Sequence, residues 1–303
     1  MTADERVQTP ATSLREEEPR SVAASYATRF AAALRKSPLT VVGFVICLGF
    51  VVLAAFAPWI APFPEDAGAV VKFQQRLQPP SAEHWFGTDL VGRDVLSRII
   101  MGSRISLITA VAVIVVAVLI GVPLGVIAAY RGGWPGAAIM RVNEIFLAIP
   151  SLVFVLVVSS LLRPSLPVTI FAIALAWWTW YARLAYGEVL SIKEEQFVDA
   201  ARTSGASEMR IAFGEILPNL TSVLTVKITL DLGYVILLGA SLGFLGLGPQ
   251  PPVPEWGTMV ADGREQLPDA WWLTTFPGLA VFVAVVGFNL FGDGLNDILG
   301  GRD

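Results

Sequence analysis

Residues 105–130 read ISLITAVAVIVVAVLIGVPLGVIAAY, an apolar stretch without one charged side chain. An α-helix rises about 1.5 Å per residue, so about 20 such residues cross a hydrocarbon core of about 30 Å. The rest of the chain has a similar character, because 54% of its 303 residues are hydrophobic and only 15% are charged. Its mean hydropathy is +0.65. This composition predicts an integral membrane protein.

Stretches of similar length recur along the chain and predict six membrane-spanning helices. Alternation with period two is weak, which argues against a transmembrane β-barrel, so we expect an all-α bundle. Pro123 and Pro150 fall inside the second and third expected spans, where a lost backbone hydrogen bond predicts a static kink or a hinge. The expected spans cover residues 39–61, 105–130, 144–162, 168–186, 221–247 and 273–291.

The segments outside these spans predict a polar tail, a membrane domain and three polar connections. Residues 1–37 are polar, carry an acidic run and predict a mostly disordered tail, whereas residues 38–303 are expected to form the membrane domain. Lys and Arg near the spans are more frequent on the side that carries both termini and the polar segment 187–220. The positive-inside rule therefore places that side in the cytoplasm and the long loops 64–104 and 249–272 outside.

Charge and motif content exclude several functions. The formal net charge is −4, from 21 basic and 25 acidic residues, which is too weak to favour nucleic-acid binding. The single cysteine, Cys47, can form no intramolecular disulfide, and the single histidine, His84, has no partners for a metal site. No GxxxxGKS or GxxxxGKT motif occurs, so the chain cannot cradle ATP phosphates and its energy must come from another subunit.

The polar segment 187–220 is long for a connection between two spans. Its apolar residues recur at helical spacing, Gly205 is placed to end a helix with a left-handed cap, and Pro218 predicts a break before the next span. The residues alone leave two interpretations open. The segment is either a rigid hairpin that sits in the groove of a partner, or an amphipathic loop that lies on the membrane surface.

The same segment resembles a known motif. Asp-Ala-Ala at 199–201, then Gly205, then Leu-Pro at 217–218 are similar to the "EAA…G…LP" motif of permease subunits of ATP-binding-cassette importers. Asp199 departs from the usual Glu, and Glu215 stands where many members carry Ile. The resemblance implies a coupling helix that fits a cleft in a nucleotide-binding subunit. The residues that it implicates are Asp199, Ala200, Ala201, Gly205, Leu217 and Pro218.

A second match narrows the branch of this family. Residues 84–98 read HWFGTDLVGRDVLSR and resemble the external-loop signature of the second, C-type subunit of dipeptide, oligopeptide and nickel permeases. The resemblance covers almost the whole chain past residue 38, and it implies the type I importer transmembrane fold. It also implies a multi-pass protein of the bacterial inner membrane with both termini in the cytoplasm. The further matching stretches are residues 130–134, 140–141 with 148–151, 241–248, 254–257 and 292–297.

The resemblance also implies a function and a set of partners. The chain would form half of a transmembrane pathway that takes up peptides delivered by an extracytoplasmic binding protein. A homologous B-type permease subunit would form the other half, and two nucleotide-binding subunits would hydrolyse ATP with Mg. The chain itself would bind no cofactor or metal and would catalyse no reaction. Nickel, glutathione and oligosaccharide importers share these motifs and are alternatives for the substrate.

Charged residues in the two long loops allow two interpretations. Asp89, Arg93 and Asp94 lie at short spacing beside glycines, which suits an internal ion-pair lock that shapes the loop. The alternative is a docking surface for the binding protein, shared with the loop 249–272. The residues of that second loop that would take part are Glu255, Trp256, Asp262 and Arg264.

The fifth expected span carries the most informative polar residues within the membrane. Lys227 and Asp231 lie four residues apart, so they can pair on one helical face. Charges at this depth are costly, and either a translocation-path role or a structural pair accounts for them. Gly239 and Gly243 permit close helix approach and are, with the charged pair, the candidates for the translocation path. Gly239 replaces a Glu that related permeases commonly carry.

Two other classes of function compete with a driven permease. A membrane-embedded enzyme such as a hydrolase would need a nucleophile with a base, or paired carboxylates or histidines, within the spans. The sequence of the expected spans offers no His and no Asp pair. A passive channel would conduct its substrate even after nucleotide is removed.

Overall fold

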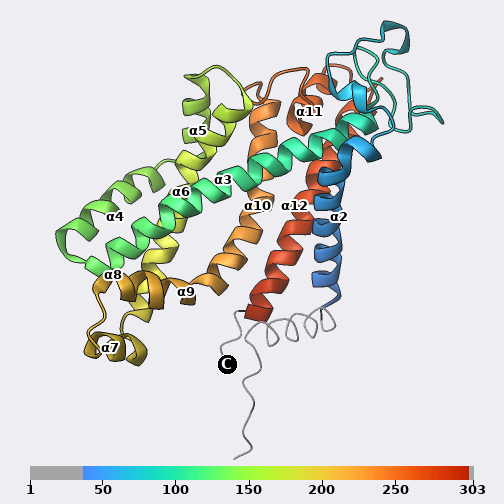
Figure 1. Cartoon of the computed structure of the whole chain (residues 1–303). Coiled ribbons are helices and arrows are strands. Elements are labelled where there is room, and N and C mark those ends of the chain that lie inside the picture. Colours follow the sequence, from blue (N-terminus) through green and yellow to red (C-terminus); the bar gives the residue numbers. More distant parts are fainter. Residues whose placement is uncertain (1–36, 300–303) are drawn as a thin grey trace, which may run out of the picture.

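The computed structural model describes residues 37–299, and no strand is present among them (Figure 1). The tail expected over residues 1–37 lies, apart from Ser37, outside this range. Five described helices are long and apolar enough to cross a membrane, and a bent helix pair adds a sixth span if it is counted as one. The five are α2 (Pro38–Ile60), α3 (Val95–Arg131), α6 (Leu166–Ile192), α10 (Thr221–Phe244) and α12 (Trp272–Leu299).

The shorter elements lie between these helices. The bent pair is α4 (Gly133–Leu147) and α5 (Ser151–Ser160). One connection carries the 3₁₀ turns η1 (Pro64–Ala67) and η2 (Phe73–Gln75), and another carries α11 (Trp256–Arg264). Between α6 and α10 lie α7 (Gln196–Thr203), α8 (Glu208–Arg210), the π-helix η3 (Ile211–Ile216) and α9 (Leu217–Asn219).

Helix α3 runs obliquely across the bundle, and α6 is its most extensive partner (Figure 1). Gly121 and Gly125 lie one turn apart on the face of α3 that meets α6. A Cβ at these positions would collide with the backbone carbonyl oxygens of Trp178 and Ala182. Small residues at this spacing let two helix backbones approach closely, which is how helices pack when lipid offers no hydrophobic driving force.

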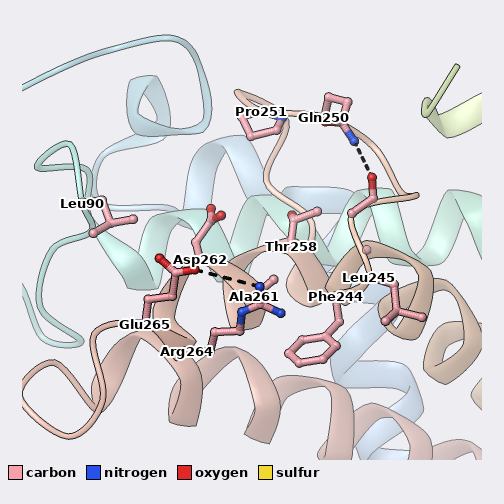
Figure 2. Close-up of a pocket in the computed structure, with 12 residues that line it drawn as sticks. Leu90, Phe244, Leu245, Gln250, Pro251, Thr258, Ala261, Asp262, Arg264 and Glu265 are labelled. Carbon is pink, nitrogen blue, oxygen red and sulfur yellow. Dashed lines mark hydrogen bonds and ion pairs between the residues drawn. The ribbon is translucent and has the colours of Figure 1, made fainter.

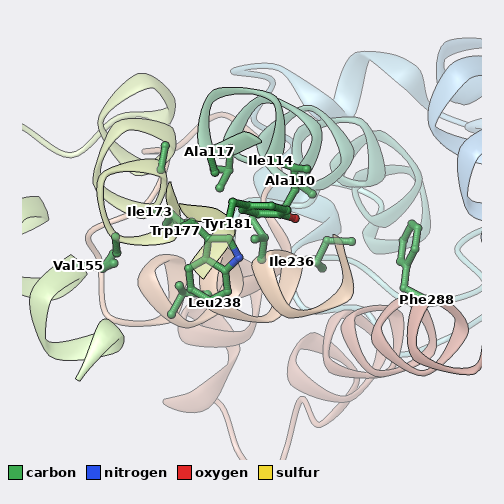
Figure 3. Packing of buried hydrophobic residues seen from close by; sticks show 14 of the residues in the cluster. Ala110, Ile114, Ala117, Val155, Ile173, Trp177, Tyr181, Ile236, Leu238 and Phe288 are labelled. Atoms are coloured by element: carbon green, nitrogen blue, oxygen red, sulfur yellow. The ribbon is translucent and has the colours of Figure 1, made fainter. Parts of the chain in front are cut away.

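The largest buried cluster lies where α3, α6 and α10 meet (Figure 3). Tyr181 and Trp177 from α6 lie beside Ile114 of α3 and Ile236 of α10, and all four side chains are buried. Helices α2 and α12 form a second close pair, because a Cβ at Gly43 would collide with the backbone of α12. Helix α10 packs along α12 and also contacts α3, so it joins the α3–α6 pair to the α2–α12 pair.

The connections gather at opposite ends of the bundle (Figure 1). Helices α7 to α9 lie at the end where α2 begins and α12 finishes. Helix α11 and the loop 61–94 lie at the other end. We refer to these as the α7 end and the α11 end.

The expected third span is wrong as one continuous helix. Helix α4 ends at Leu147 and α5 begins at Ser151, and the two axes differ by 82°. Pro150, which precedes α5, has no backbone N–H and keeps Ile149 from the helical conformation. The proline that was expected to kink a span therefore separates two helices.

Helix boundaries also differ from the expected loops. Asp94 caps α3, so residues 95–104 are helical although they were expected in the loop 64–104. Helix α6 continues to Ile192, so the connection expected over residues 187–220 begins later in the structure. Both extensions are short amphipathic ends of long helices, which a search for purely apolar runs does not detect.

The contact between α3 and α6 generates the first prediction. Gly125→Ala places a methyl group against the Ala182 carbonyl and forces the helices apart. We expect the free energy of unfolding to fall by roughly 1–3 kcal/mol. In detergent, the apparent melting temperature of the variant should be several degrees lower than that of the wild type. Gly49→Ala in α2 is the matched control, since no described residue outside its own helical turn lies within 4 Å of its Cβ position. Equal melting temperatures for the two variants would contradict the proposed packing.

Candidate functional site

The segment between α6 and α10 folds as a compact hairpin at the α7 end. Val198 of α7 is buried, and Ile211 and Ile216 of η3 are buried beside it as part of the main cluster. Phe197 and Asp199, its neighbours in sequence, are exposed. One face of α7 therefore anchors the hairpin to the bundle, and the opposite face is presented outward.

Gly205 ends α7 with a left-handed cap, as the sequence predicts. Its φ is +80°, and its N–H donates to the Arg202 carbonyl at 2.9 Å. The next N–H, of Ala206, donates back to the Ala201 carbonyl at 3.1 Å, which completes a Schellman motif. Among the described residues, no atom beyond the two chain neighbours of Gly205 lies within 4 Å of a Cβ built there. The backbone conformation, and not crowding, therefore requires glycine.

The other residues of the motif divide between the outward and the inward face. Asp199, Ala200 and Pro218 are exposed, whereas Ala201 and Leu217 are half-buried against the main cluster. The structure therefore brings Ala200 and Gly205 together on an outward surface of small residues. Leu217 lies behind that surface, where it helps to hold the hairpin.

Arg202 links this hairpin to helix α3. Its guanidinium lies 5.9 Å from the centre of the Tyr130 ring, which belongs to the last turn of α3. The same guanidinium donates to the Asp199 carboxylate at 3.1 Å. The sequence motif names Asp199 but not Arg202 or Tyr130, because their contact joins residues that are far apart in sequence.

A π-helix precedes Pro218. The N–H of Leu217 donates to the carbonyl of Ala212, five residues back, instead of the usual four. Pro218 has no N–H to continue an α-helical ladder, and the chain turns through α9 into α10. The break expected at Pro218 is thus a widened helical turn and not an open loop.

At the α11 end, the predicted cluster of Asp89, Arg93 and Asp94 is built into the loop. Asp89 accepts from the Arg93 guanidinium at 2.7 Å. Asp94 is only 1% exposed, accepts the Ser97 N–H at 2.7 Å as the cap of α3, and bonds His84 Nδ1 at 2.9 Å. Asp94 therefore shapes the loop and offers no surface to a partner in this conformation.

Sequence reasoning missed two members of this network. Asp66 is fully buried, pairs with Lys72 at 2.8 Å and accepts the Asp94 N–H at 2.8 Å. Arg98 is buried, and its guanidinium donates to the Asp66 carbonyl at 3.0 Å. The spacing of charged residues in the sequence does not indicate these contacts, because they join residues about thirty positions apart.

The second loop contains buried and exposed candidates. Glu255 caps α11 by accepting the N–H groups of Gly257 and Thr258 at 2.9 and 2.8 Å. The indole N–H of Trp256 donates to the Ile99 carbonyl at 2.9 Å, and both side chains are buried. Burial raises the pKa of Glu255 to about 7, against the opposing effect of its two backbone hydrogen bonds.

Asp262 and Arg264 differ from these residues because they line an open cavity of about 480 Å³ (Figure 2). The Arg264 side chain is 56% exposed, lies 5.8 Å from the centre of the Phe244 ring, and approaches Glu265 at 4.0 Å. Burial raises the pKa of Asp262, and the nearby Arg98 and Arg93 oppose that shift. Of the residues predicted for docking in this loop, these two are accessible.

The polar residues of the fifth expected span lie in α10. Lys227 Nζ is 2.6 Å from Asp231 Oδ1, so the pair forms as the spacing predicts. Asp231 is buried and Lys227 is half-buried. Gly239 faces Thr109 of α3, and Gly243 lies so close to the Glu255 carboxylate that a Cβ there would collide with it.

Comparison with known proteins places this helical membrane fold in a family. Residues 121–302 match the family described as binding-protein-dependent transport system inner membrane component, and residues 25–80 match the N-terminal TM domain of oligopeptide transport permease C. The chain belongs to the first family, whose fold is the type I importer transmembrane fold. It is thus a multi-pass membrane permease subunit and not an enzyme.

Individual relatives agree with this assignment. The probable D,D-dipeptide transport system permease protein DdpC of Escherichia coli K12 is 44% identical over 266 residues, 88% of each chain. The dipeptide transport system permease protein DppC of Alkalihalophilus pseudofirmus is 42% identical over 266 residues, 88% of this chain and 86% of the relative. The glutathione transport system permease protein GsiD of Escherichia coli O6 is 40% identical over 261 residues, 86% of this chain and 85% of the relative.

The Glu255 cap generates a prediction about pH. A raised carboxyl pKa means that the folded state holds the proton more tightly than the unfolded state, whose pKa is near 4.5. The resulting stabilisation grows as pH falls from about 7 and is lost as pH rises through that value. Glu255→Gln removes this dependence. We therefore expect the melting temperature of the variant minus that of the wild type to rise from near zero at pH 5 to a few degrees at pH 8.

Thermal unfolding of the purified chain, followed by tryptophan fluorescence, measures this difference. Glu265→Gln is the control, because that side chain is exposed just beyond the other end of α11. Its melting temperature should follow that of the wild type at every pH. A constant difference between Glu255→Gln and wild type would show that the carboxyl does not titrate in this range.

Proposed function

We propose that this chain is the permease subunit of an ATP-binding-cassette importer and forms half of a membrane pathway for peptides delivered by an extracytoplasmic binding protein. The observation that carries the proposal is the α7 hairpin, with a small-residue surface that faces outward and a buried face that fixes it to α3 and the main cluster. The family and the names of the peptide permeases among its relatives support the same function.

The driving force comes from two separate nucleotide-binding subunits that carry ATP and Mg. The absence of a P-loop motif from the sequence supports this division of labour. Ala200, Gly205 and their neighbours Asp199 and Pro218 meet the cleft of one such subunit. This permease needs no cofactor or metal of its own, because its contribution is mechanical.

The translocation path follows α6 and α10, shared with a homologous B-type permease subunit. Trp180 and Tyr234 are exposed on these two membrane-length helices, and the half-buried Lys227 lies 6.0 Å from the Trp180 ring centre. Placing a charged lysine against lipid costs free energy. A helix face that carries one is therefore more stable beside a water-filled path or a partner subunit. We therefore place these residues beside the path and not against lipid.

The α7 end lies in the cytoplasm of a bacterial cell, and the α11 end lies outside its inner membrane. Helix α2 begins and helix α12 ends at the α7 end, which supports placing both termini on the cytoplasmic side (Figure 1). The binding protein docks at the α11 end, on the cavity lined by Asp262 and Arg264. Asp89 and Arg93 border the neighbouring cavity and extend this surface.

Glutathione is the second candidate substrate. The glutathione permease GsiD is nearly as similar to this chain as the dipeptide permeases are. Glutathione is itself a small peptide, so the same path accommodates either substrate, and the binding protein makes the selection.

Two substitutions at Gly205 test the coupling surface. Gly205→Arg adds bulk to the outward face and should abolish ATP-driven uptake and ATPase coupling in the reconstituted importer, while substrate capture by the binding protein persists. Gly205→Asn is the comparison, because Asn tolerates the left-handed conformation with a smaller side chain. It should retain more transport than Gly205→Arg. Normal coupling by an assembled Gly205→Arg complex would refute a docking role for this surface.

Charge reversal tests the docking surface at the α11 end. Arg264→Glu should weaken the stimulation of ATPase activity by loaded binding protein several-fold, with a larger effect at low ionic strength. Arg163→Glu is the matched control, since this exposed arginine lies at the same end, in the turn between α5 and α6. Unchanged stimulation by Arg264→Glu in a correctly assembled complex would exclude Arg264 from the docking surface.

A further inference from the structure

The cavity beside the outer end of α10 carries charged side chains that contribute little to holding the fold together. It measures about 480 Å³ and lies between the last turn of α10 and the last turn of α11 (Figure 2). Small-ligand pockets commonly measure roughly 300–1,000 Å³, so this volume suits a small ligand. The charges that line it indicate which ligand.

Asp262 is the first of these charged residues. Its side chain is exposed, and Arg98 and Arg93 act on its carboxylate only through charge, without a hydrogen bond. Glu255, at the start of the same helix, instead uses both carboxylate oxygens to cap it. The C-terminal ends of α10 and α11 also border the cavity, and helix C-termini carry partial negative charge. The Asp262 carboxylate is therefore available to a cationic group.

Arg264 is the second charged residue, and its present contacts are weak. Figure 2 shows its guanidinium between the Phe244 ring, whose centre is 5.8 Å away, and the Glu265 carboxylate, at 4.0 Å. At a side chain that is 56% exposed, such contacts contribute only about 1 kcal/mol or less each. A carboxylate that accepts two parallel hydrogen bonds is a stronger partner for arginine. The guanidinium can therefore turn to an incoming carboxylate at little cost.

The arginines of the neighbouring cavity are already engaged. Arg93 Nε donates to Asp89 at 2.7 Å, and Arg98 Nε lies 3.6 Å from the same carboxylate. Arg98 also donates to the Asp66 carbonyl at 3.0 Å. A ligand that used these arginines would have to break the network that shapes the loop, whereas Asp262 and Arg264 are free of it.

The rest of the lining suits a peptide. Leu90 and Phe244 supply apolar surface for a side chain. Gln250 donates its amide nitrogen to the carbonyl groups of Gly246 and Gly248 at 3.2 and 3.0 Å, which leaves its side-chain oxygen to accept a peptide N–H. A peptide of two or three residues spans about 7–10 Å and carries an ammonium group at one end and a carboxylate at the other.

We propose that this cavity is a receiving site for a zwitterionic peptide of two or three residues, in which Asp262 binds the terminal ammonium group and Arg264 the terminal carboxylate. The inference rests on the proposed function, because a binding protein must release the peptide at the α11 end. The location supports this role, since Phe244 ends α10, one of the two helices of the proposed path. Recognition of the charged ends lets the site accept peptides of different sequence.

Binding of the dipeptide alanylphenylalanine to the complete importer in nanodiscs, without the binding protein, tests the site. A titration followed by saturation-transfer difference NMR measures the Kd. Asp262→Asn and Arg264→Gln should each raise the Kd roughly 2- to 5-fold, the effect of losing one exposed ion pair. Asp269→Asn and Arg76→Gln are the matched controls, because both side chains are exposed in the loops at the same end and neither lines the cavity.

Two blocked peptides test which residue binds which end. The N-acetylated dipeptide lacks the ammonium group, and the C-terminal amide lacks the carboxylate. Asp262→Asn should weaken binding of the free dipeptide and the amide but not of the acetylated peptide. Arg264→Gln should weaken binding of the free and the acetylated peptide but not of the amide. Equal effects of each substitution on all three peptides would overturn the proposal.

The same preparation separates this inference from the proposed function. A wild-type importer that takes up the dipeptide with ATP and the binding protein, yet binds none of it alone, would overturn the receiving site and leave the proposed function intact. Equal Kd values for Asp262→Asn and Asp269→Asn would overturn the receiving site as well. A wild-type complex without ATP-driven uptake would contradict the proposed function itself.

Discussion

The backbones of α3 and α6 approach so closely at Gly121 and Gly125 that no side chain fits between them. In a bilayer, where burying apolar surface between helices gains little over contact with lipid, such interlocking is the main way to fix one helix against another. Helix α3 reaches from the buried ion-pair network at its first turn to Tyr130 in its last. The α3–α6 contact therefore sets the frame that relates the two ends of the molecule.

The two ends are held by different physical means. At the α11 end, buried carboxylates cap helices and bind arginine, lysine and histidine side chains, and removing one partner would strand a buried charge. At the α7 end, the hairpin is held by a few apolar side chains and by one arginine stacked on a tyrosine. Contacts of the second kind can be remade after a small displacement. The structure is therefore stiff where a delivered substrate would be received and more adaptable where force would enter.

The sequence predicted best what depends on local or additive physics. Membrane spans were recognisable because the transfer energies of about 20 successive residues add together, and the cap at Gly205 was recognisable because a Schellman motif involves only neighbouring residues. Which residues pair in the polar network was not predictable, because Asp94 and Asp66 are 28 positions apart in the sequence. The 82° bend before α5 was also beyond prediction. A proline indicates where a helix stops, whereas the direction taken afterwards depends on the helices already in place.

The path of force follows from the connectivity around the π-helix. The hairpin is covalently continuous with α6 on one side and, through η3 and Pro218, with α10 on the other. Helix α6 is locked to α3 by the glycine contact, so a push on the hairpin cannot move α6 alone. Helix α10 enters through a widened turn whose hydrogen bonds are already irregular, and it meets α6 across a seam with unsatisfied polar atoms. Helix α10 in turn packs along α12, with Gly233 and Gly292 at the contact, so a displacement that reaches α10 is passed on to α12.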